Sequence, residues 1–441
     1  MNVLNLFTIP SNSLKQIIAW RRDFHKYPEV GWTEFRTASI IAYELQSLGF
    51  QVQVGKEVVS EERMGVPSEE ILTKVYESAR TNGGHIGFID KMVGGYTGVV
   101  GTIEGTKTGP TIAFRFDMDA LDILESKEAG HAPELNGFSS THAGRMHACG
   151  HDAHSSLGLG LATILSQNKD KIEGTIKIIF QPAEEGVRGA KSMVDAGVVD
   201  DVDYFLSMHV GTGAPLGTVI GGSNGFLATS KIDAKFTGKA AHAGAEPEKG
   251  TNALLAAASA ILGLHSISRH SGGASRINVG TCVAGDGRNI IPSHATLKLE
   301  TRGENSEVHT YVHDQAISVL EGAAQMHGAN LSYEIVGAAR TCSSSRELAE
   351  LVINAAKDVS DVNQTIPIAD FAAGSEDATF MMERVQQNGG LSTYSIFGTT
   401  LAAGHHHERF DIDEAVLPIA LHTWLATIEQ IYQHERRGAN D

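Results

Sequence analysis

The chain has 441 residues, of which 41% are hydrophobic and 20% are charged. That composition is ordinary for a folded protein of two or three domains, and it excludes disorder as the main state. The 35 Lys and Arg residues against 52 Asp and Glu residues give a net charge of −17. Such a surface repels phosphate backbones and anionic membranes, so we expect no nucleic-acid partner and no membrane partner.

The sequence contains no apolar stretch of the length that a membrane helix needs. The best candidate, Ala253 to Leu264, is too short, and no basic region precedes an apolar run as in a secretory signal. The three cysteines, Cys149, Cys282 and Cys342, are too few for a disulfide scaffold. We therefore expect a cytoplasmic protein with reduced thiols.

The N-terminal part predicts helices followed by strands. Apolar residues at helical spacing predict a helix over 11–26 and a second over 33–48. Residues 50–54 alternate like a strand, and 68–80 has the pattern of a polar helix. The last of these segments has the character of an insertion at the edge of a domain.

Four apolar runs farther along the chain each lead into a polar cluster. The runs are 111–116 before Asp117 and Asp119, 175–180 before Gln181, Glu184 and Glu185, 204–208 before His209, and 393–397 before a loop with His405, His406 and His407. Helical segments between several of these runs favour an α/β fold, with a mixed, mostly parallel sheet and helices on both faces. Because ligand sites in such sheets lie at the carboxyl ends of the strands, we expect the four clusters to converge.

A different pattern interrupts this alternation. It consists of a strand, a helix, two strands, a helix and a strand, over residues 231–237, 247–265, 276–283, 295–301, 307–327 and 331–336. The order β-α-β-β-α-β is that of a ferredoxin-like unit. We therefore expect a discontinuous catalytic domain of residues 1–224 and 339–441, with an inserted lid or dimerisation domain of residues 225–338.

The densest group of metal-ligand residue types is His147-Ala-Cys-Gly-His-Asp-Ala-His154. Gly150 permits a tight turn that directs Cys149 and His151 at one ion, and a thiolate beside an imidazole suits zinc and related metals. We expect a helix from Ser155, whose N-terminus would favour the thiolate. A redox role for Cys149 is the weaker alternative, because no second cysteine is near in the sequence.

The adjacent carboxylates Glu184 and Glu185 follow a strand. In an extended segment their side chains would point to opposite sides, so that one binds a metal while the other acts as a base. Asp119 is a candidate for orienting a ligand histidine from behind, and Asp117 has a structural alternative. Three consecutive histidines cannot all face one site, so we expect only one or two of His405, His406 and His407 to contribute.

Five motifs in this order resemble the M20 metallopeptidase family, in particular its amidohydrolases that cleave N-acyl amino acids. They are His147-Ala-Cys-Gly-His-Asp152, Gln181-Pro-Ala-Glu-Glu185, Met208-His209, Gly238-Lys-Ala-Ala-His-Ala243 and Gly374-Ser-Glu-Asp377. The resemblance covers nearly the whole chain. Finer features, among them Trp20-Arg-Arg-Asp-Phe-His25 and the extra segment around residues 60–95, point to one subgroup of these amidohydrolases.

The resemblance implies a binuclear metal site, with two divalent ions per subunit. The family suggests manganese, whereas a thiolate with imidazoles argues for zinc. The implied roles are Cys149 as the bridging ligand, His151, Glu185, His209 and His406 as further ligands with His405 as the alternative to His406, Glu184 as general base, Asp119 behind a ligand, His242 as oxyanion donor, and Asn289 and Arg302 as binders of the substrate carboxylate.

The implied activity is hydrolysis of the amide bond of an N-acyl amino acid. We expect p-aminobenzoyl-glutamate as the small-molecule substrate, within folate catabolism, with hippurate-like and N-acetyl substrates as alternatives. A non-catalytic subunit that only binds acyl amino acids is a further alternative, but it would not need the base Glu184. The expected partner is a second copy in a homodimer, whose insert lends His242, or a related M20-like subunit in a heterodimer.

Overall fold

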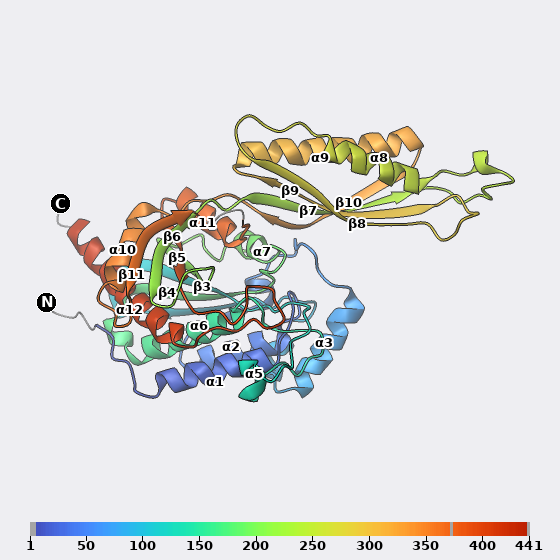
Figure 1. Ribbon diagram of the computed structural model, residues 1–441. Helices are drawn as coiled ribbons and strands as arrows, with labels where there is room; N and C mark the ends of the chain where they lie inside the picture. The colour runs from blue at the N-terminus through green and yellow to red at the C-terminus, as the bar shows by residue number, and fades with distance from the viewer. Residues whose placement is uncertain (1–5, 371–373, 439–441) are drawn as a thin grey trace. The chain divides into compact units, whose positions relative to one another are not determined.

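The computed structural model describes residues 6–370 and 374–438, and the chain forms two compact units (Figure 1). The first unit comprises Met1–Asn224, Cys342–Phe371 and Phe380–Asp441. The second unit is inserted between these parts, begins at Gly225 and runs to Thr341, three residues beyond the end expected from sequence, and it includes a short return segment that ends at Thr379. Among the described residues, no helix combines the length and the apolar character needed to cross a membrane.

The first unit is built on an eight-stranded sheet in the order β1-β2-β4-β3-β5-β12-β6-β11. The strands are β1 (Gln51–Val54), β2 (Val99–Glu104), β3 (Lys107–Asp117), β4 (Glu173–Gln181), β5 (Tyr204–Val210), β6 (Thr218–Asn224), β11 (Gln364–Asp370) and β12 (Leu391–Phe397). The four predicted apolar runs are the neighbours β4, β3, β5 and β12, which pair in parallel. Their carboxyl ends therefore lie at one edge, as the sequence predicted.

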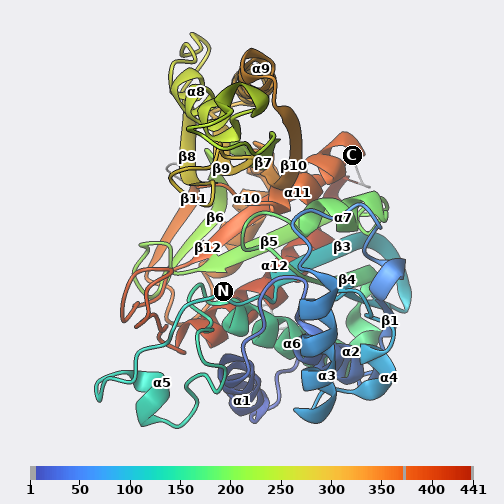
Figure 2. The same cartoon turned by 90° about the vertical axis from the view of Figure 1, so that its right-hand side faces the viewer.

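Helices cover both sides of this sheet (Figure 2). They are α1 (Ser13–Lys26), α2 (Phe35–Ser47), α3 (Glu69–Thr81), α4 (Ile86–Ile89), α5 (Ala132–Leu135), α6 (His151–Gln167), α7 (Ala190–Asp195), α10 (Arg346–Ala356), α11 (Ala378–Gln387) and α12 (Val416–Gly438). Trp424 of α12 packs edge-on against Phe114 of β3 and Phe397 of β12, with ring centroids 5.6 and 5.0 Å apart. The main core lies between α6, α12 and the sheet, while α7 lies on the opposite side.

Helix α6 begins at His151, so the expectation of a helix from Ser155 was wrong. Gly150 precedes the helix in a left-handed conformation, with φ of 99°, and its carbonyl accepts the N–H groups of Ala153 and His154. The segment reads as a loop from sequence because Cys, His and Asp are weak helix formers. The early start places His151 and His154 three residues apart on one helix face, with their rings stacked at 5.4 Å.

The second unit has the predicted β-α-β-β-α-β order. Its elements are β7 (Ala228–Thr237), α8 (Ala253–His265), β8 (Ser275–Ala284), β9 (His294–Gly303), α9 (Ser306–His327) and β10 (Asn330–Ala339). The strands form an antiparallel sheet in the order β10-β7-β9-β8, and its core lies beneath α8 and α9. Helix α8 begins six residues later than predicted, because Pro247–Lys249 forms a separate 3-10 turn and Asn252 caps the helix by accepting the Leu255 N–H.

Candidate metal centre

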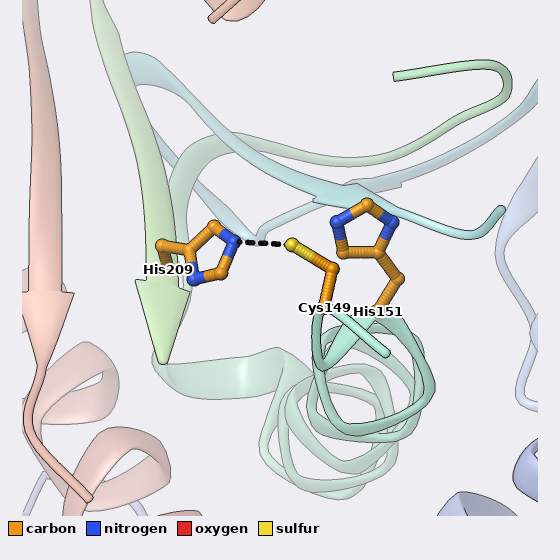
Figure 3. Close-up of side chains that lie close together, drawn as sticks. All are labelled: Cys149, His151 and His209. Atoms are coloured by element: carbon orange, nitrogen blue, oxygen red, sulfur yellow. Dashed lines mark hydrogen bonds between the residues drawn. The ribbon is translucent and has the colours of Figure 1, made fainter. Parts of the chain in front are cut away.

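The loops at the carboxyl edge of the sheet bring together the predicted ligands of the first unit. Within each of three groups, the possible ligand atoms lie within 4.8 Å of one another. The groups are Cys149 with His151 and His209, Cys149 with Glu185 and His406, and His151 with Glu184 and Glu185. Because the groups share members, they form one continuous cluster (Figure 3 shows the first).

Cys149 occupies the end of the loop that leads into α6. Its Sγ lies 3.4 Å from Nε2 of His209 and 3.7 Å from Nδ1 of His405. Gly150 is required here for two reasons, since its φ is positive and an added Cβ would lie 2.7 Å from Cγ2 of Val210. Burial, together with the nearby Glu185, raises the pKa of the Cys149 thiol well above its usual range. The expectation that the helix N-terminus favours the thiolate is therefore outweighed, and deprotonation requires a cation.

The rings of His151 and His209 are both held by a backbone carbonyl. Nδ1 of His151 lies 2.8 Å from the carbonyl oxygen of Asp119, and Nδ1 of His209 lies 2.8 Å from that of Val210. A carbonyl can only accept, so each Nδ1 carries the proton and donates it. Each Nε2 then presents a lone pair to the cluster, which is the tautomer that a metal ligand needs.

The electrostatics of the cluster favour positive charge. Although burial acts in the opposite direction, Asp117 and Cys149 raise the pKa of His151 well above its usual range. Burial, with the neighbouring His154 and His405, lowers the pKa of His209 well below its usual range, so that ring is neutral. The negative potential that favours a proton at Nε2 of His151 equally favours a metal cation there.

Glu184 and Glu185 stand on a turn rather than on an extended segment, so the premise of the sequence argument was wrong. Strand β4 ends at Gln181, and Ala183 and Val187 both have positive φ, at 51° and 59°. The two carboxylates nevertheless separate. Oε2 of Glu184 lies 3.9 Å from Nε2 of His151, while Oε1 of Glu185 lies 3.4 Å from Nε2 of His406.

Asp119 supports this turn from below. Its two carboxylate oxygens accept the backbone N–H groups of Glu184 and Glu185, at 3.0 and 2.9 Å. Its own carbonyl oxygen accepts the proton of His151, so one buried residue fixes both the carboxylate pair and a histidine. Glu34 adds a further hydrogen bond by accepting the N–H of Ala183 at 2.8 Å. These contacts hold the strained turn in place.

The loop after β12 brings both His405 and His406 to the cluster. Nε2 of His405 accepts the N–H of Thr212 at 3.1 Å, so the proton of a neutral His405 ring is on the Nδ1 that faces Cys149. His406 is about half-exposed, its N–H donates to the carbonyl of Ala148, and its Nε2 faces Glu185. The tautomers therefore favour His406 over His405 as the donor of a lone pair.

A buried triad behind the ligands was missed by the sequence analysis. Oδ1 of Asp117 accepts from Nδ1 of His154 at 2.6 Å, and Oδ2 accepts from Nη1 of Arg115 at 2.7 Å. Nε2 of His154 accepts the N–H of Val210, so both nitrogens of this ring are engaged. The structural alternative for Asp117 is therefore correct. No local signal marks the triad, because His154 is 37 residues away from Asp117 in the chain.

The donor set fits divalent metal ions. Nε2 of His151 and Oε1 of Glu185 are buried with no hydrogen-bond partner, and both belong to the cluster. An unpaired buried acceptor is costly, and a cation among these atoms would satisfy both. One thiolate with imidazoles and carboxylates is a set that suits zinc, and its carboxylates also suit manganese.

The predicted residues of the second unit fall into two places. His242 and Asn289 are neighbours, since His242 bridges to Ile290 and the carbonyl of Asn289 accepts the N–H of Ala243. Arg302 lies toward the other end of β9, about 26 Å from His294 at 3.3 Å per residue. The Arg302 guanidinium pairs with Glu300, with Nε 3.0 Å from Oε1. Asn289 and Arg302 of one chain therefore do not form a common site.

Comparisons with known proteins agree with this chemistry. Residues 113–430 match the model of "Peptidase family M20/M25/M40". The chain is 53% identical to one of the subunits of the p-aminobenzoyl-glutamate hydrolase of Escherichia coli, over 97% of this chain and 98% of that protein. It is 51% identical to indole-3-acetyl-aspartic acid hydrolase of Enterobacter agglomerans, over 94% of this chain and 95% of that protein.

A solved structure gives the same result for the fold. The aminobenzoyl-glutamate utilization protein of Klebsiella pneumoniae is 46% identical and superposes with a TM-score of 0.82, covering 94% of this chain and 96% of that one. The resemblance inferred from five short motifs is thereby confirmed, for the family and for the subgroup. The chain belongs to peptidase family M20/M25/M40 and is a metal-dependent amidohydrolase.

Proposed function

We propose that the chain hydrolyses p-aminobenzoyl-glutamate to p-aminobenzoate and glutamate at the cluster around Cys149. The observation that carries the proposal is the position of Glu184. Its carboxylate lies beside His151 in the metal cluster, while its backbone N–H is fixed by Asp119. A site that only bound metal would not need a second carboxylate held in this way.

In this proposal, the ligands of two divalent ions are Cys149, His151, Glu185, His209 and His406. Cys149 is common to two of the ligand groups, so its thiolate is the bridging ligand. The Nε2 lone pairs of His151 and His209 support their assignment, and the engaged Nε2 of His405 supports His406 in its place. We propose manganese as the metal, with zinc as the alternative that the thiolate favours.

When bound, the two ions would polarise the amide carbonyl and lower the pKa of water. Glu184 takes the proton from the water that attacks the amide carbon, and then delivers it to the leaving nitrogen of glutamate. Asp119 keeps the Glu184 backbone fixed during both transfers through its buried hydrogen bond. The ligand Glu185, held by the same aspartate, stays apart from the proton transfer.

The substrate class follows from what two relatives have in common. The names p-aminobenzoyl-glutamate hydrolase and indole-3-acetyl-aspartic acid hydrolase both describe an aromatic acyl group on the nitrogen of an acidic amino acid. We place p-aminobenzoyl-glutamate first, in folate catabolism, because the Klebsiella pneumoniae protein also carries aminobenzoyl-glutamate in its name. Indole-3-acetyl-aspartate is the second candidate, favoured by the nearly equal identity of the second relative.

We propose that His242 donates a hydrogen bond to the oxyanion. Its Nδ1 accepts the N–H groups of Gly244 and Ala245, each at 3.1 Å, so the neutral ring carries its proton on Nε2. That N–H belongs to an exposed side chain and is available to another molecule. Asn289, its neighbour, would bind the substrate carboxylate together with Arg302, with Asn289 and Arg302 supplied by different subunits.

The partner in this arrangement is a second copy of the chain. Strand β8 is an edge of the sheet in the second unit, and Val283 on it and Leu262 on α8 are 68% and 75% exposed. An exposed edge with apolar side chains favours pairing with another chain. A heterodimer with a related M20-like chain is the alternative, because the Escherichia coli relative is by its name one of several subunits of a hydrolase. We propose a cytoplasmic setting, which suits the three free cysteines.

The function is tested by hydrolysis after reconstitution with Mn²⁺ or Zn²⁺. We expect kcat/KM for p-aminobenzoyl-glutamate to exceed the values for indole-3-acetyl-aspartate, benzoyl-glycine and acetylated amino acids. Higher kcat/KM for indole-3-acetyl-aspartate would replace the first substrate by the second. Binding of these compounds without hydrolysis at any metal loading would favour a non-catalytic subunit instead.

A further inference from the structure

Helix α1 carries a buried pair of basic residues that the proposed chemistry does not use. Arg21 and His25 lie one helical turn apart, and both side chains are almost fully buried. They belong to the segment Trp20-Arg-Arg-Asp-Phe-His25, which the sequence analysis singled out without a role. Buried cations are rare unless they are paired, so their partners indicate what they do.

Arg21 contacts three carboxylates that come from two distant segments. Its Nε lies 2.9 Å from Oδ2 of Asp152, on the first turn of α6. Its Nη2 donates to Oδ1 of Asp411, and its Nη1 donates to Glu414 at 3.2 Å. The planar guanidinium presents donors in several fixed directions, so a single side chain can link carboxylates on separate segments.

His25 extends the same network on the side away from Asp411. Its Nδ1 lies 2.8 Å from Oδ2 of Asp152, and its Nε2 lies 2.9 Å from Oε1 of Glu125. Because both partners are carboxylates, both ring nitrogens donate and the ring is an imidazolium. Asp152 is thus held between two cations, from α1, in one orientation.

The carboxylates that Arg21 links adjoin proposed metal ligands on both segments. Asp152 follows His151 directly, in the first turn of α6. Asp411 closes the loop that carries His405 and His406, since its carbonyl accepts the N–H of Ala402 at 3.0 Å. The two segments are more than 250 residues apart in sequence, and Arg21 contacts both through buried side chains.

We propose that Arg21 is a positioning residue, which sets the spacing between His151 on α6 and the histidine ligand in the loop after β12. The inference rests on the proposed function in that it takes these histidines as metal ligands. It assigns no contact with substrate to Arg21. Loss of the link should therefore weaken metal binding without removing any ligand, as is typical of residues that orient ligands from behind.

The test is metal affinity in Arg21→Lys, with Arg22→Lys as the matched control. Lysine keeps the charge but lacks the planar fork, so it cannot join Asp152 and Asp411 together. Arg22 is the adjacent residue, 39% exposed, and pairs with Glu414 alone among the carboxylates. Metal-free full-length protein is titrated with Co²⁺, and binding is followed by the thiolate-to-cobalt absorption that Cys149 would give. We expect affinity about 10–100-fold weaker in Arg21→Lys and within twofold of wild type in Arg22→Lys.

A second pair of variants tests the link from its other end. Asp411→Asn should weaken Co²⁺ binding like Arg21→Lys, whereas Glu414→Gln should not. Because both changes break one link, the double variant Arg21→Lys with Asp411→Asn should bind no more weakly than the worse single variant. If Arg21→Lys fails to fold by circular dichroism, the comparison of Asp411→Asn with Glu414→Gln decides the question alone.

Three outcomes would overturn the inference. Wild-type affinity in folded Arg21→Lys or Asp411→Asn would leave the network with a role in stability only. Fully multiplicative losses in the double variant would mean that the two residues act independently. A wild-type chain that binds no Co²⁺ would refute the metal assignment of the proposed function, and the link with it. Normal Co²⁺ behaviour without hydrolysis of any acyl amino acid would refute the substrate alone and leave the link standing.

Discussion

Replacing Asp119 with Asn alters the support beneath Glu184 and Glu185 while it keeps the size of the side chain. The wild-type carboxylate is 1% exposed and accepts one N–H group on each oxygen. Asparagine has one acceptor oxygen, so one of these N–H groups would face an NH₂ donor. A hydrogen bond to a charged group contributes about 1.5–3 kcal/mol, and a buried unpaired donor costs about 1–3 kcal/mol.

A combined effect of about 3 kcal/mol lies in the lower half of that sum and corresponds to about 100-fold. We therefore expect kcat for p-aminobenzoyl-glutamate to fall about 100-fold in Asp119→Asn, measured at saturating metal with metal content determined in parallel. Asp122→Asn is the control, because Asp122 is 75% exposed and pairs only loosely with Arg145, at 3.3 Å. A kcat within threefold of wild type in fully metallated Asp119→Asn would refute the argument that this carboxylate holds the base.

Four further predictions concern the cluster and its surroundings. Cys149→Ser should lower metal content, measured by elemental analysis, together with activity; full occupancy and unchanged turnover would contradict the bridging role. Glu184→Gln should lower kcat by about 10²–10⁴-fold with metal retained, whereas Glu185→Gln should lose metal, and exchanged behaviour would reverse the two roles. His242→Ala should cost about 10²–10³-fold in rate, and mixing it with Glu184→Gln should restore part of the activity if His242 acts across a dimer; no recovery under conditions of demonstrated subunit exchange would falsify donation in trans. Against the effect of burial, Asp152 and Glu125 raise the pKa of His25 to about 9, so about 3 kcal/mol of stability that is fully present below pH 6.5 should disappear as the pH rises through 9. The Tm of metal-free wild type should therefore fall more steeply over that interval than the Tm of His25→Gln, and parallel curves would show that His25 is not charged in the fold.

The parallel centre of the sheet was predictable because each of its strands is a buried apolar run that ends in polar residues. The strands that sequence analysis missed lack this pattern. Strand β11 contains Pro367 and alternates between partly and fully exposed positions at the sheet edge. Strand β2 contains Gly101, where an added Cβ would lie 2.9 Å from Leu45, so a close helix contact replaces the expected side chain.

The ligand cluster was predictable because Cys149, His151 and the Glu184–Glu185 pair lie in short, chemically distinctive motifs. The supporting residues were not, since their partners are far away in the chain. Arg21 meets Asp411 across 390 residues, and neither residue is unusual in its local context. The turn at Glu184 was mistaken for extended chain because Ala183 has no local signal for a positive φ, which is set by the acceptor Glu34 instead.

The chain order of the first unit has a consequence for biosynthesis. Strand β12 pairs with β5 in the centre of the sheet, yet it is synthesised about 180 residues later, after the whole of the second unit. A ribosome at about 5–20 residues per second needs roughly 9–36 s to cover that distance. During this interval the contiguous second unit can fold locally, while β5 waits with an unpaired apolar edge. The nascent chain is therefore most prone to aggregation just before β12 emerges, and the last histidine of the metal centre arrives only afterwards.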